Sequence, residues 1–454
     1  MTTRLICCST LFQLISVSAM RAAGAFGSDR CVLLLTNTST APELVADVDA
    51  GDGVAEALLP HFDAVVHLDE WIAPIHPREW RVASANGPML ERLFRSVFEL
   101  GDGPLELVLE SLPNAPGGAL AEVFPSARIS MHSDGLMSYG PLRRALPRHV
   151  AERIEAIYYV DLVPGLRPVR LEEYQPRHVS VPAESLREVF AELASHTLDR
   201  LPDPSLLRDR TSAALLLGQY LTAIDILSGE EEVALHQAMI DAAVEVGCTD
   251  IVFKPHPQAP PAALGPLQKY AETVGAKLSV VREAVSAEAL FELMHPAVVI
   301  SCFSTALTTA DAVYGLPVIA VGTDTVVSRL TPYQNSNRVP LAIIDAVYAQ
   351  GILPPAQAEP HTPTEDLQAM LETLAYTLQP QFYDNHRELA EEFLTAAADT
   401  PLLAYFTRGR LRRLGLPGTP PGSAPQRVVQ ALKRPVKAVI PPAARRKLRR
   451  VLRG

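Results

Sequence analysis

Short apolar segments alternate along the chain with longer segments whose apolar residues recur at helical spacing. The short segments are continuously apolar, which is typical of parallel strands in a sheet that helices cover on both faces. The candidate strands are RLICC, CVLLLTN, AVVHL, LELVLE, ARISMH and IYYVDL in the first half, then ALLLGQ, DIVFKP, KLSVVR, AVVISCF and PVIAVG. Helices are predicted at about 184–199, 230–247, 285–294 and 304–314.

The chain divides at a polar, proline-bearing stretch, DRLPDPSLLRDRTS, near residues 200–212. Because a new first strand follows it, we predict an α/β protein with two Rossmann-like domains, 1–205 and 206–407, and a tail at 408–454. If the two domains face each other, the carboxyl ends of both sheets border one cleft, where ligands bind in open α/β folds. A second linker, GLPGTPPGSAPQ at 415–426, should be flexible or extended.

The N-terminal stretch MTTRLICCSTLFQLISVSAM has an arginine followed by a mostly apolar run, as a signal peptide has. Ser9, Thr10 and Gln13 interrupt the run, and it is too short and too polar for a transmembrane helix. We therefore predict a buried strand at Leu5 to Cys8, a loop, and a helix from about Leu11.

The composition is that of a globular protein, since 48% of the 454 residues are hydrophobic and 20% are charged. The five cysteines are an odd number without a C-x-x-C pair, so neither a disulfide framework nor a zinc site is indicated. A reducing cytoplasm fits this cysteine usage best.

Charge is distributed unevenly along the chain. The segment from Arg408 to Gly454 contains 14 Lys or Arg and no Asp or Glu; because the whole chain has a formal net charge of −11, the remainder carries −25. An acidic body with a basic tail indicates an anionic partner, either nucleic acid or an anionic membrane. The terminal RRKLRRVLRG places Leu448, Val451 and Leu452 among its charges, as a basic amphipathic helix on phospholipid headgroups does.

We favour the membrane over nucleic acid as the partner of this tail. The protein is then expected to be cytoplasmic and peripheral on the inner face of the plasma membrane. A tail that is solvated, or that packs back on the body, is the alternative.

The first polar motif is SMHSDGLMSYG at 130–140, which follows an apolar-containing strand. It places Asp134 at the carboxyl end of that strand, in a tight turn that Gly135 permits. A carboxylate there could take a proton from an acceptor hydroxyl as a general base. The alternative is an ordinary Asp-Gly turn, which is common at strand ends.

The second motif is IVFKPHPQ at 251–258, a strand that runs into Lys254 and His256. The prolines on either side of His256 fix their own φ angles and bias the residues before them away from the α region. His256 could protonate a departing phosphate, and Lys254 could neutralise it. The alternative is a strand-to-loop turn that contains a histidine.

The third motif is VVISCFSTALTTADAVYGLPVIAV at 298–321. After a strand, Ser301, Ser304 and Thr305 precede or open a helix, whose free N–H groups and dipole form an anion site. A phosphate would fit there, although Ser and Thr cap many helices that bind no ligand. Asp311, on the same helix, could reach a ribose hydroxyl or be a surface carboxylate.

The three motifs together form one coherent site across the predicted cleft. A base in the first domain, an acid and a cation in the second, and an anion-binding helix start suit displacement of a phosphate leaving group by a hydroxyl. No cluster of Asp, Glu or His has metal-ligand spacing, and no D-x-D stands at a predicted strand end. The predicted site therefore stabilises its leaving group with His, Lys and helix N–H groups, and needs no metal or cofactor.

At these residues the sequence resembles the bacterial sialyltransferases and polysialyltransferases of the two-Rossmann (GT-B) glycosyltransferase class. Their acidic D/E-D/E-G motif is similar to Ser133-Asp134-Gly135, their HP motif to His256-Pro257, and their S-S/T motif to Ser304-Thr305. The N-terminal CSTLFQL is similar to the family's first strand and loop. The resemblance covers about residues 4–330.

The resemblance implies that Asp134 is the general base, that His256 is the general acid, and that Ser304 and Thr305 hold the phosphate of CMP. It implies an inverting, metal-independent transfer from CMP-sialic acid to a glycan or glycolipid acceptor in cell-surface polysaccharide synthesis. Ser133 departs from the family, which usually has a second carboxylate there, and this puts the identity of the sugar in doubt. The further residues expected to bind donor are Lys254, Pro257, Ser301 and Asp311, and those expected to bind substrate are Ser9, Gln13, Gly135 and Gln219.

Two other functions are open on the sequence. A CDP-polyol phosphotransferase of the teichoic-acid type resembles this chain in a GT-B fold and an HP motif, and would release CMP from CDP-glycerol or a relative. A non-catalytic nucleotide-sugar-binding protein would keep the fold and lack turnover.

Overall fold

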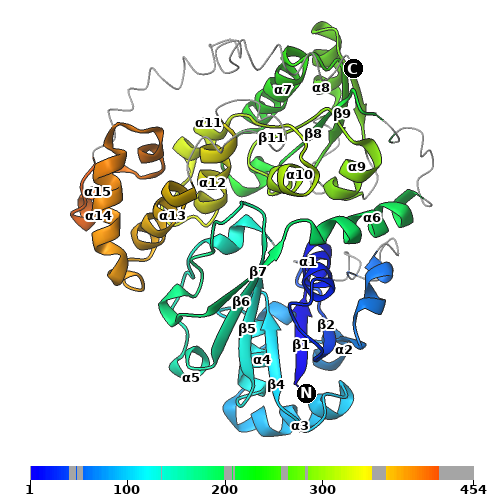
Figure 1. The fold of residues 1–454 in the computed structure, drawn as a ribbon, viewed down its shortest axis with the longest axis vertical. Helices are drawn as coiled ribbons and strands as arrows, with labels where there is room; N and C mark the ends of the chain where they lie inside the picture. The colour runs from blue at the N-terminus through cyan, green and yellow to red at the C-terminus, as the bar shows by residue number, and fades with distance from the viewer. Residues whose placement is uncertain are drawn as a thin grey trace. The chain divides into compact units, whose positions relative to one another are not determined.

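The protein consists of two compact units in a computed structural model (Figure 1). The first unit comprises Met1–Asp161 and Arg170–Arg200, and the second comprises Leu162–Val169 and the chain from Leu201 onward. The structure describes residues 2–39, 48, 55–133, 135–198, 207, 210–256, 264–281, 285–349 and 364–418.

The first unit is built on one seven-stranded parallel sheet with the strand order β3-β2-β1-β4-β5-β6-β7. Six of these strands are predicted from their apolar runs, and the structure confirms them. The seventh, β7, has the sequence RHVSVP, whose polar and half-exposed residues suit the edge of a sheet. The strands are β1 Thr3–Cys8, β2 Arg30–Leu35, β3 Ala64–His67, β4 Leu105–Leu109, β5 Arg128–Ser133, β6 Ile154–Asp161 and β7 Arg177–Pro182.

Both faces of this sheet are covered, which explains why its inner strands are mostly apolar. On one face, Leu107 and Met131 belong to a core that includes the buried rings of Phe94 and Phe98. On the other, α1 contacts α6, β5 and β6, and the rings of Phe26 and Tyr158 lie 5.0 Å apart, edge to face. The helices are α1 Leu11–Ala22, α2 Asp69–Ile72, α3 Gly87–Val97, α4 Gly117–Val123, α5 Arg148–Ala151 and α6 Ser185–Leu198.

The N-terminal stretch lies inside this sheet. β1 pairs with β2 and β4 along its length, and α1 begins at Leu11, so the predicted strand and helix are confirmed. Thr10 Oγ1 accepts the Gln13 backbone N–H at 3.2 Å, which caps the helix start. Among the described residues, no helix has both the length and the apolar composition that crossing a membrane requires.

The second unit has a five-stranded parallel sheet with the order β10-β9-β8-β11-β12. All five strands are predicted from the sequence and confirmed. The predicted helices α7, α9 and α10 of this unit, and α6 of the first unit, are confirmed as well. The strands are β8 Ala214–Leu217, β9 Asp250–Lys254, β10 Lys277–Val280, β11 Val298–Ser301 and β12 Val318–Ala320. The helices up to β12 and just after it are α7 Gly229–Glu245, α8 Leu264–Thr273, α9 Ala287–Met294, α10 Ala306–Tyr314 and α11 Thr323–Arg329.

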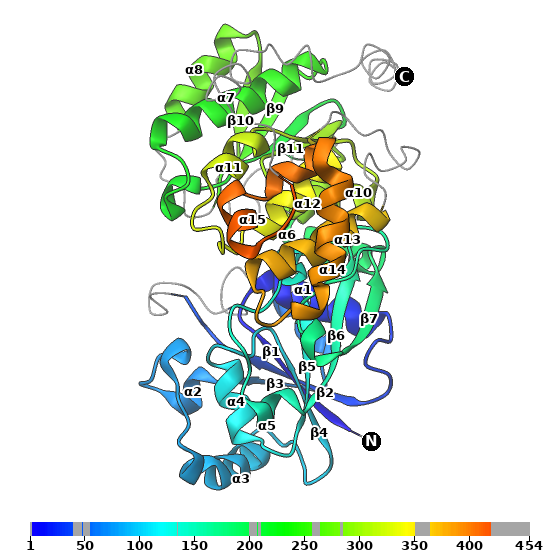
Figure 2. The ribbon, with the colours of Figure 1, turned by 90° about the vertical axis from the view of Figure 1, so that its left-hand side faces the viewer.

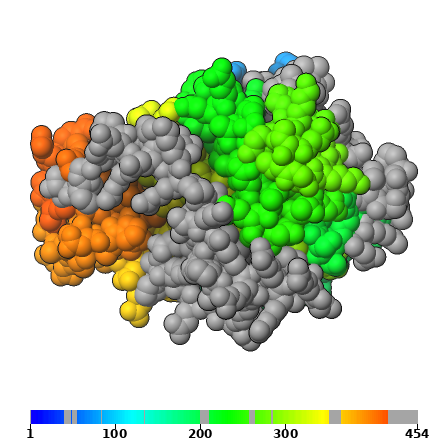
Figure 3. Space-filling model, turned by 90° about the horizontal axis from the view of Figure 1, so that it is seen from above, coloured from blue at the N-terminus to red at the C-terminus, as the bar shows by residue number. Residues whose placement is uncertain are grey.

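The second unit also carries a group of four helices, drawn yellow to orange-red in Figure 2. They are α12 Arg338–Tyr348, α13 Thr364–Leu378, α14 Arg387–Ala396 and α15 Arg408–Leu414. α15 packs on α13, because Leu411 is buried and the Arg410 guanidinium donates to Thr377 O at 2.5 Å. The segment predicted as a tail thus begins as a packed helix, and its residues 419–454 lie outside the described part of the chain. Figure 3 shows the orange surface of α14 and α15 at one end of this unit and the green surface of its sheet region at the other.

Both sheets reverse their strand order at one point. In the first unit the chain builds β1, β2 and β3 outward in one direction and then returns to place β4 on the other side of β1. In the second unit the same reversal falls between β8 and β11. Ligands of open α/β sheets bind outside the carboxyl ends of the strands at such a switch point. The switch points therefore mark where each unit should carry its chemistry.

Candidate functional site

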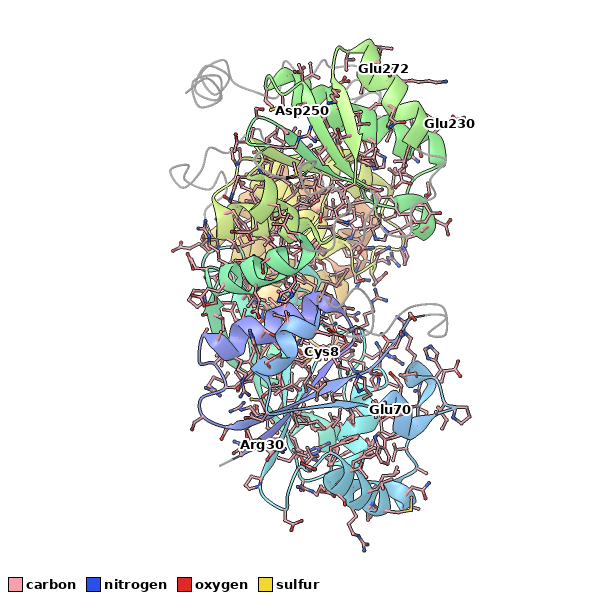
Figure 4. The ribbon with its side chains drawn as sticks, turned by 90° about the vertical axis from the view of Figure 1, so that its right-hand side faces the viewer. Cys8, Arg30, Glu70, Glu230, Asp250 and Glu272 are labelled. Atoms are coloured by element: carbon pink, nitrogen blue, oxygen red, sulfur yellow. The ribbon has the colours of Figure 1, made fainter. Side chains whose placement is uncertain are left out.

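The switch point of the first unit holds a hydrogen-bonded carboxylate. Ser9 follows β1 directly after Cys8, which is labelled in Figure 4, and Glu110 follows β4. Ser9 Oγ lies 2.9 Å from Glu110 Oε2 and 3.2 Å from Gln13 Oε1. The side-chain amide of Gln13 also donates to Glu110 Oε2, while its oxygen accepts the Ser9 backbone N–H at 2.7 Å. Two predicted substrate residues therefore hold a third residue, Glu110, in a fixed orientation.

The predicted base lies next to this group along the sheet. Asp134 itself is outside the described residues, but Ser133 ends β5 and is buried, and Gly135 follows in an extended conformation with φ 171°. Leu109 pairs with Met131, so Glu110 and the end of β5 leave the sheet at the same edge. The structure thus brings Ser9, Glu110 and Ser133 to the ends of three neighbouring strands, β1, β4 and β5, and Gln13 lies on the helix that follows β1.

A cavity of about 730 Å³ opens beside Glu110 in the first unit. Its walls come from the loop after β4, the start of α4, the loop before α5 and the segment after α2. Three exposed arginines, Arg78, Arg81 and Arg144, line it together with Glu110. Guanidinium groups bind carboxylates and phosphates through paired hydrogen bonds, so this cavity suits an anionic ligand.

Two glycines let the wall of this cavity close up. A Cβ atom on Gly117 would lie 1.9 Å from Ser111 O, and one on Gly118 would lie 2.9 Å from Leu112 O. Only residues without a side chain allow the start of α4 to approach the loop after β4 so closely. The sequence NAPGGAL therefore fixes the position of the chain immediately after Glu110.

In the second unit, β9 carries Lys254 to the carboxyl edge of the sheet. Asp250, labelled in Figure 4, marks the opposite end of the same strand. Burial lowers the pKa of the Lys254 ammonium, and the nearby carboxylate of Glu288 partly offsets this effect. Burial in turn raises the pKa of Glu288, which lies in the first turn of α9. Lys254 and Glu288 are both partly or fully buried, and each favours the charged form of the other.

His256 lies just beyond the strand, and its environment disfavours the imidazolium. Burial lowers its pKa, the positive charge of Lys254 lowers it further, and the carboxylate of Glu232 acts in the opposite direction. Glu232 is held by the Leu221 backbone N–H at 2.7 Å and by the Thr222 hydroxyl at 2.7 Å. Burial and Lys254 thus favour the neutral imidazole, and a negative charge placed beside His256 would raise its pKa.

The ring of Tyr220 lies 6.5 Å from that of His256, centroid to centroid. Pro257, the second residue of the HP motif, falls outside the described residues. The structure therefore describes the Lys254 to His256 half of the motif, and the stiffening predicted for Pro257 stays a prediction.

The switch point of this unit is closed by hydrogen bonds between β8 and β11. Gln219 Oε1 accepts the Phe303 backbone N–H at 2.9 Å, and Ser301 Oγ donates to Leu217 O at 2.8 Å. Ser301 has an exposed fraction of 0%, so its hydroxyl fixes the strand ends and leaves no surface for a bound donor. Gly218 allows β8 and β9 to approach, because a Cβ atom there would lie 2.8 Å from Phe253 Cζ.

The start of α10 lies directly after β11. Ser304 Oγ accepts the Ala306 backbone N–H at 3.2 Å, and the carbonyl of Thr305 accepts the Thr309 N–H at 3.2 Å. The helix begins at Ala306, slightly later than predicted, because Ser304 and Thr305 form its cap. Asp311 is half-buried and accepts a hydrogen bond from the Tyr348 hydroxyl at 3.1 Å, and burial raises its pKa. That contact orients Asp311 toward α12.

Three carboxylates of these sites escape the sequence reasoning. Glu110 carries the same signal as Asp134, an acidic residue directly after an apolar strand, and could have been found by it. Glu232 and Glu288 lie on helices, and only the fold brings their charges to His256 and Lys254. Within the ranges that the structure describes, no group of three or more His, Cys, Asp or Glu side chains could hold a metal ion.

Comparison with known proteins gives one family. A family model described as alpha-2,8-polysialyltransferase (POLYST) matches residues 4–323. No curated protein sequence matches the chain. The family match and the two parallel-sheet units agree with the predicted GT-B fold class.

The solved structures that match this chain are distant from it. A glycosyltransferase from Rickettsia africae has 12% sequence identity over 91% of this chain and 96% of that chain, with a TM-score of 0.38. The GT-B domain of a sialyltransferase from Photobacterium damselae has 13% identity over 76% of this chain and 96% of that chain, with a TM-score of 0.37. At these values neither structure carries an argument about individual residues.

Proposed function

The chain belongs to the alpha-2,8-polysialyltransferase family and is a glycosyltransferase, and we propose from this premise that it transfers sialic acid, or a related sugar, from a CMP-activated donor to a glycan hydroxyl. The transfer inverts the anomeric carbon and needs no metal ion. The acceptor hydroxyl loses its proton to Asp134, and its oxygen bonds to the anomeric carbon. The bond from that carbon to the phosphate oxygen breaks, and CMP leaves with the electron pair while His256 supplies a proton.

The observation that carries this proposal is the strand end at Lys254 and His256. The Lys254 ammonium and the His256 imidazole follow each other at the end of β9. The buried carboxylate of Glu288 acts on the first, and that of Glu232 acts on the second. A phosphate leaving group develops negative charge as its bond to the sugar breaks. Fixed positive charge and a proton donor at that position stabilise the transition state more than the bound donor.

The lowered pKa of His256 fits a general acid that becomes charged on binding. In the free protein, burial and the charge of Lys254 lower the pKa of His256 and so favour the neutral imidazole. The phosphate of a CMP-sugar would add negative charge beside it and raise its pKa. The proton is then present when the donor is bound, which is when general acid catalysis requires it.

The start of α10 supports a phosphate site next to this strand end. The dipole of α10 favours an anion at its start, and the Ser304 hydroxyl, whose oxygen accepts the Ala306 N–H at 3.2 Å, can donate its own proton to that anion. Ser304 and Thr305 are half-exposed at this cap. In the proposal they hold the phosphate of CMP, whereas Ser301 and Asp311 support the fold around it.

In the first unit, Asp134 serves as the base and the cavity receives the acceptor. Three arginines around that cavity suit a glycan that carries carboxylates, as chains of sialic acid do. The acceptor is therefore proposed to be an anionic glycan or glycolipid of the cell surface. The basic segment at 419–454 would hold the enzyme at the inner face of the plasma membrane, where lipid-linked acceptors are found.

The test is donor choice by the purified protein in the presence of EDTA. CMP-sialic acid and CDP-glycerol are supplied separately with an α2,8-linked tetramer of sialic acid, and CMP release and product are followed. We expect CMP and a longer sialic acid chain from the first donor, with the opposite anomeric configuration from that of the donor, and no product from the second. CMP release from CDP-glycerol alone would identify a polyol phosphotransferase instead.

A further inference from the structure

Resting on the proposed function, we propose that Glu110 is a second carboxylate of the acceptor site, which accepts a hydrogen bond from the acceptor sugar and holds the reacting hydroxyl beside Asp134. It touches the substrate but does not take the proton. In this position it takes over part of the role of the carboxylate that Ser133 replaces.

The place of Glu110 in the sheet is the first support. It follows β4, and Ser9 follows β1, so the two residues stand on either side of the switch point of the first unit. The register of β4 with β5 pairs Leu109 with Met131. Glu110, the residue after Leu109, therefore leaves β4 next to the end of β5, whose residue His132 stands two positions before Asp134 along the chain.

The hydrogen bonds of Glu110 are the second support, because they engage only one of its oxygens. Oε2 receives Ser9 Oγ and the amide of Gln13. Within the part of the chain that the structure describes, Oε1 accepts no hydrogen bond, and it is not among the buried polar atoms that lack one. Gln13 is nearly buried and is itself fixed by the Ser9 N–H. The network thus orients the carboxylate and leaves one oxygen for a ligand.

The cavity is the third support. Glu110 contributes to its lining, whereas the three arginines lie on other segments of the wall. An anionic glycan bound to those guanidiniums presents its hydroxyls to the remaining acceptor group, and ionised carboxylates accept hydroxyl hydrogen bonds strongly.

The decisive variant is Glu110→Gln, because it replaces the hydrogen-bond acceptor Oε1 with an NH₂ group, which is a donor. Its amide oxygen would keep the hydrogen bonds from Ser9 and Gln13, so its NH₂ group would face the cavity and could no longer accept from a sugar hydroxyl. Losing a hydrogen bond to a charged group predicts a fall of about 10- to 100-fold in kcat/KM for the acceptor. CMP release from CMP-sialic acid without acceptor should stay within about twofold of the wild type, since it depends on His256.

The matched control is Glu91→Gln. Glu91 lies on α3 and is not part of the cavity lining, and its carboxylate pairs with Arg95 at 2.9 Å. We expect this variant to keep the acceptor kinetics of the wild type. If Glu110→Gln lost transfer and acceptor-free CMP release in parallel, Glu110 would have a structural role and the proposal would be wrong. Unchanged acceptor kinetics in Glu110→Gln would also overturn the proposal.

Binding of the acceptor gives a readout that does not depend on the donor chemistry. In a titration of the full chain with an α2,8-linked tetramer of sialic acid, Glu110→Gln should raise the Kd about tenfold or more, whereas Glu91→Gln should not. Equal Kd values for the wild type and Glu110→Gln would contradict the inference. A wild type that binds the tetramer but releases no CMP contradicts the proposed function, and the same titration then decides on Glu110 by itself.

Discussion

The two units share the same succession of strand neighbours around their switch points but carry opposite chemistry at their strand ends. In the first unit the polar groups are hydroxyl, amide and carboxylate, and hydrogen bonds hold Glu110 in place. In the second unit they are an ammonium and an imidazole, and burial with neighbouring charges sets their pKa values. In the proposed function, the first unit accepts hydrogen bonds and a proton, and the second supplies positive charge and a proton.

This difference teaches how one sheet design serves two halves of a transfer. An acceptor hydroxyl needs a base and a fixed orientation, which a hydrogen-bond network provides. A phosphate leaving group needs charge that is strongest where water is excluded, which burial provides. Changes in the first unit should therefore affect the acceptor, and changes in the second should affect the donor.

The largest effect on the acceptor side is expected from Asp134→Asn. Without the base, transfer to the sialic acid tetramer should fall by about 10²- to 10⁴-fold. Acceptor-free CMP release should continue, because the leaving-group residues are intact. The check is to measure both rates on the same preparation. Equal losses in the two rates would contradict the assignment of acceptor chemistry to the first unit and donor chemistry to the second.

Lys254→Met should lower the donor kcat/KM by about 10²-fold, since one fixed charge on the phosphate is lost. It should also shift the pH profile. A general acid must be protonated, so kcat/KM for the donor falls as pH rises through the pKa of His256, which burial and Lys254 hold below its ordinary value. Removing the ammonium raises that pKa and moves the falling limb to higher pH. A limb that stays in place would show that Lys254 does not act on His256.

Two glycine variants compare how tightly the chain is packed near the strand ends of the two units. Gly117→Ala would place a Cβ atom 1.9 Å from the backbone oxygen of Ser111, and Gly218→Ala would place one 2.8 Å from the ring of Phe253. The first should cost about 3 kcal/mol of unfolding free energy and the second about 1 kcal/mol, since a side chain yields more easily than backbone. Urea unfolding measures both, with Gly229→Ala as the control because no atom lies within 4 Å of its Cβ.

The kinetic consequences of these two variants should separate by unit. Gly117→Ala moves the chain next to Glu110 and should raise the KM for the acceptor, whereas Gly218→Ala should slow CMP release. If both variants changed the same kinetic constant, the assignment of acceptor and donor to different units would be wrong.

The smallest effect on catalysis is expected from truncation after Gly418. The remaining chain keeps α15, which packs on α13, and should release CMP at the rate of the full chain. Loss of the basic residues beyond this point should weaken sedimentation with phosphatidylserine vesicles by more than tenfold, at about 1 kcal/mol for each Lys or Arg near the surface. Equal sedimentation of the two proteins would remove the membrane proposal.

The sequence predicts most of the fold because its strands are buried on both faces. A continuous apolar run such as CVLLL in β2 is buried only where a sheet is covered on both faces. β7 goes unpredicted, since an edge strand with RHVSVP needs no apolar run. The sequence also predicts that Lys254 and His256 stand together at one strand end, because a single short motif contains both, and the structure agrees; their catalytic roles stay a proposal.

The supporting charges could not be predicted in the same way. Glu232 acts on His256 from α7, and Glu288 acts on Lys254 from α9. Their sequence separation from the motif hides a proximity that only the packing of helices on the sheet creates. Ser301 shows the converse, because a hydroxyl at the right place in the motif is fully buried and serves the strand ends.

The most direct test of the account is CMP release from CMP-sialic acid without acceptor, comparing the wild type with His256→Ala in the presence of EDTA. We predict clear release by the wild type and a loss of about 10²- to 10⁴-fold in the variant, with unfolding by urea unchanged. Release that persists in His256→Ala would contradict the central claim that the strand end in the second unit supplies the leaving-group chemistry.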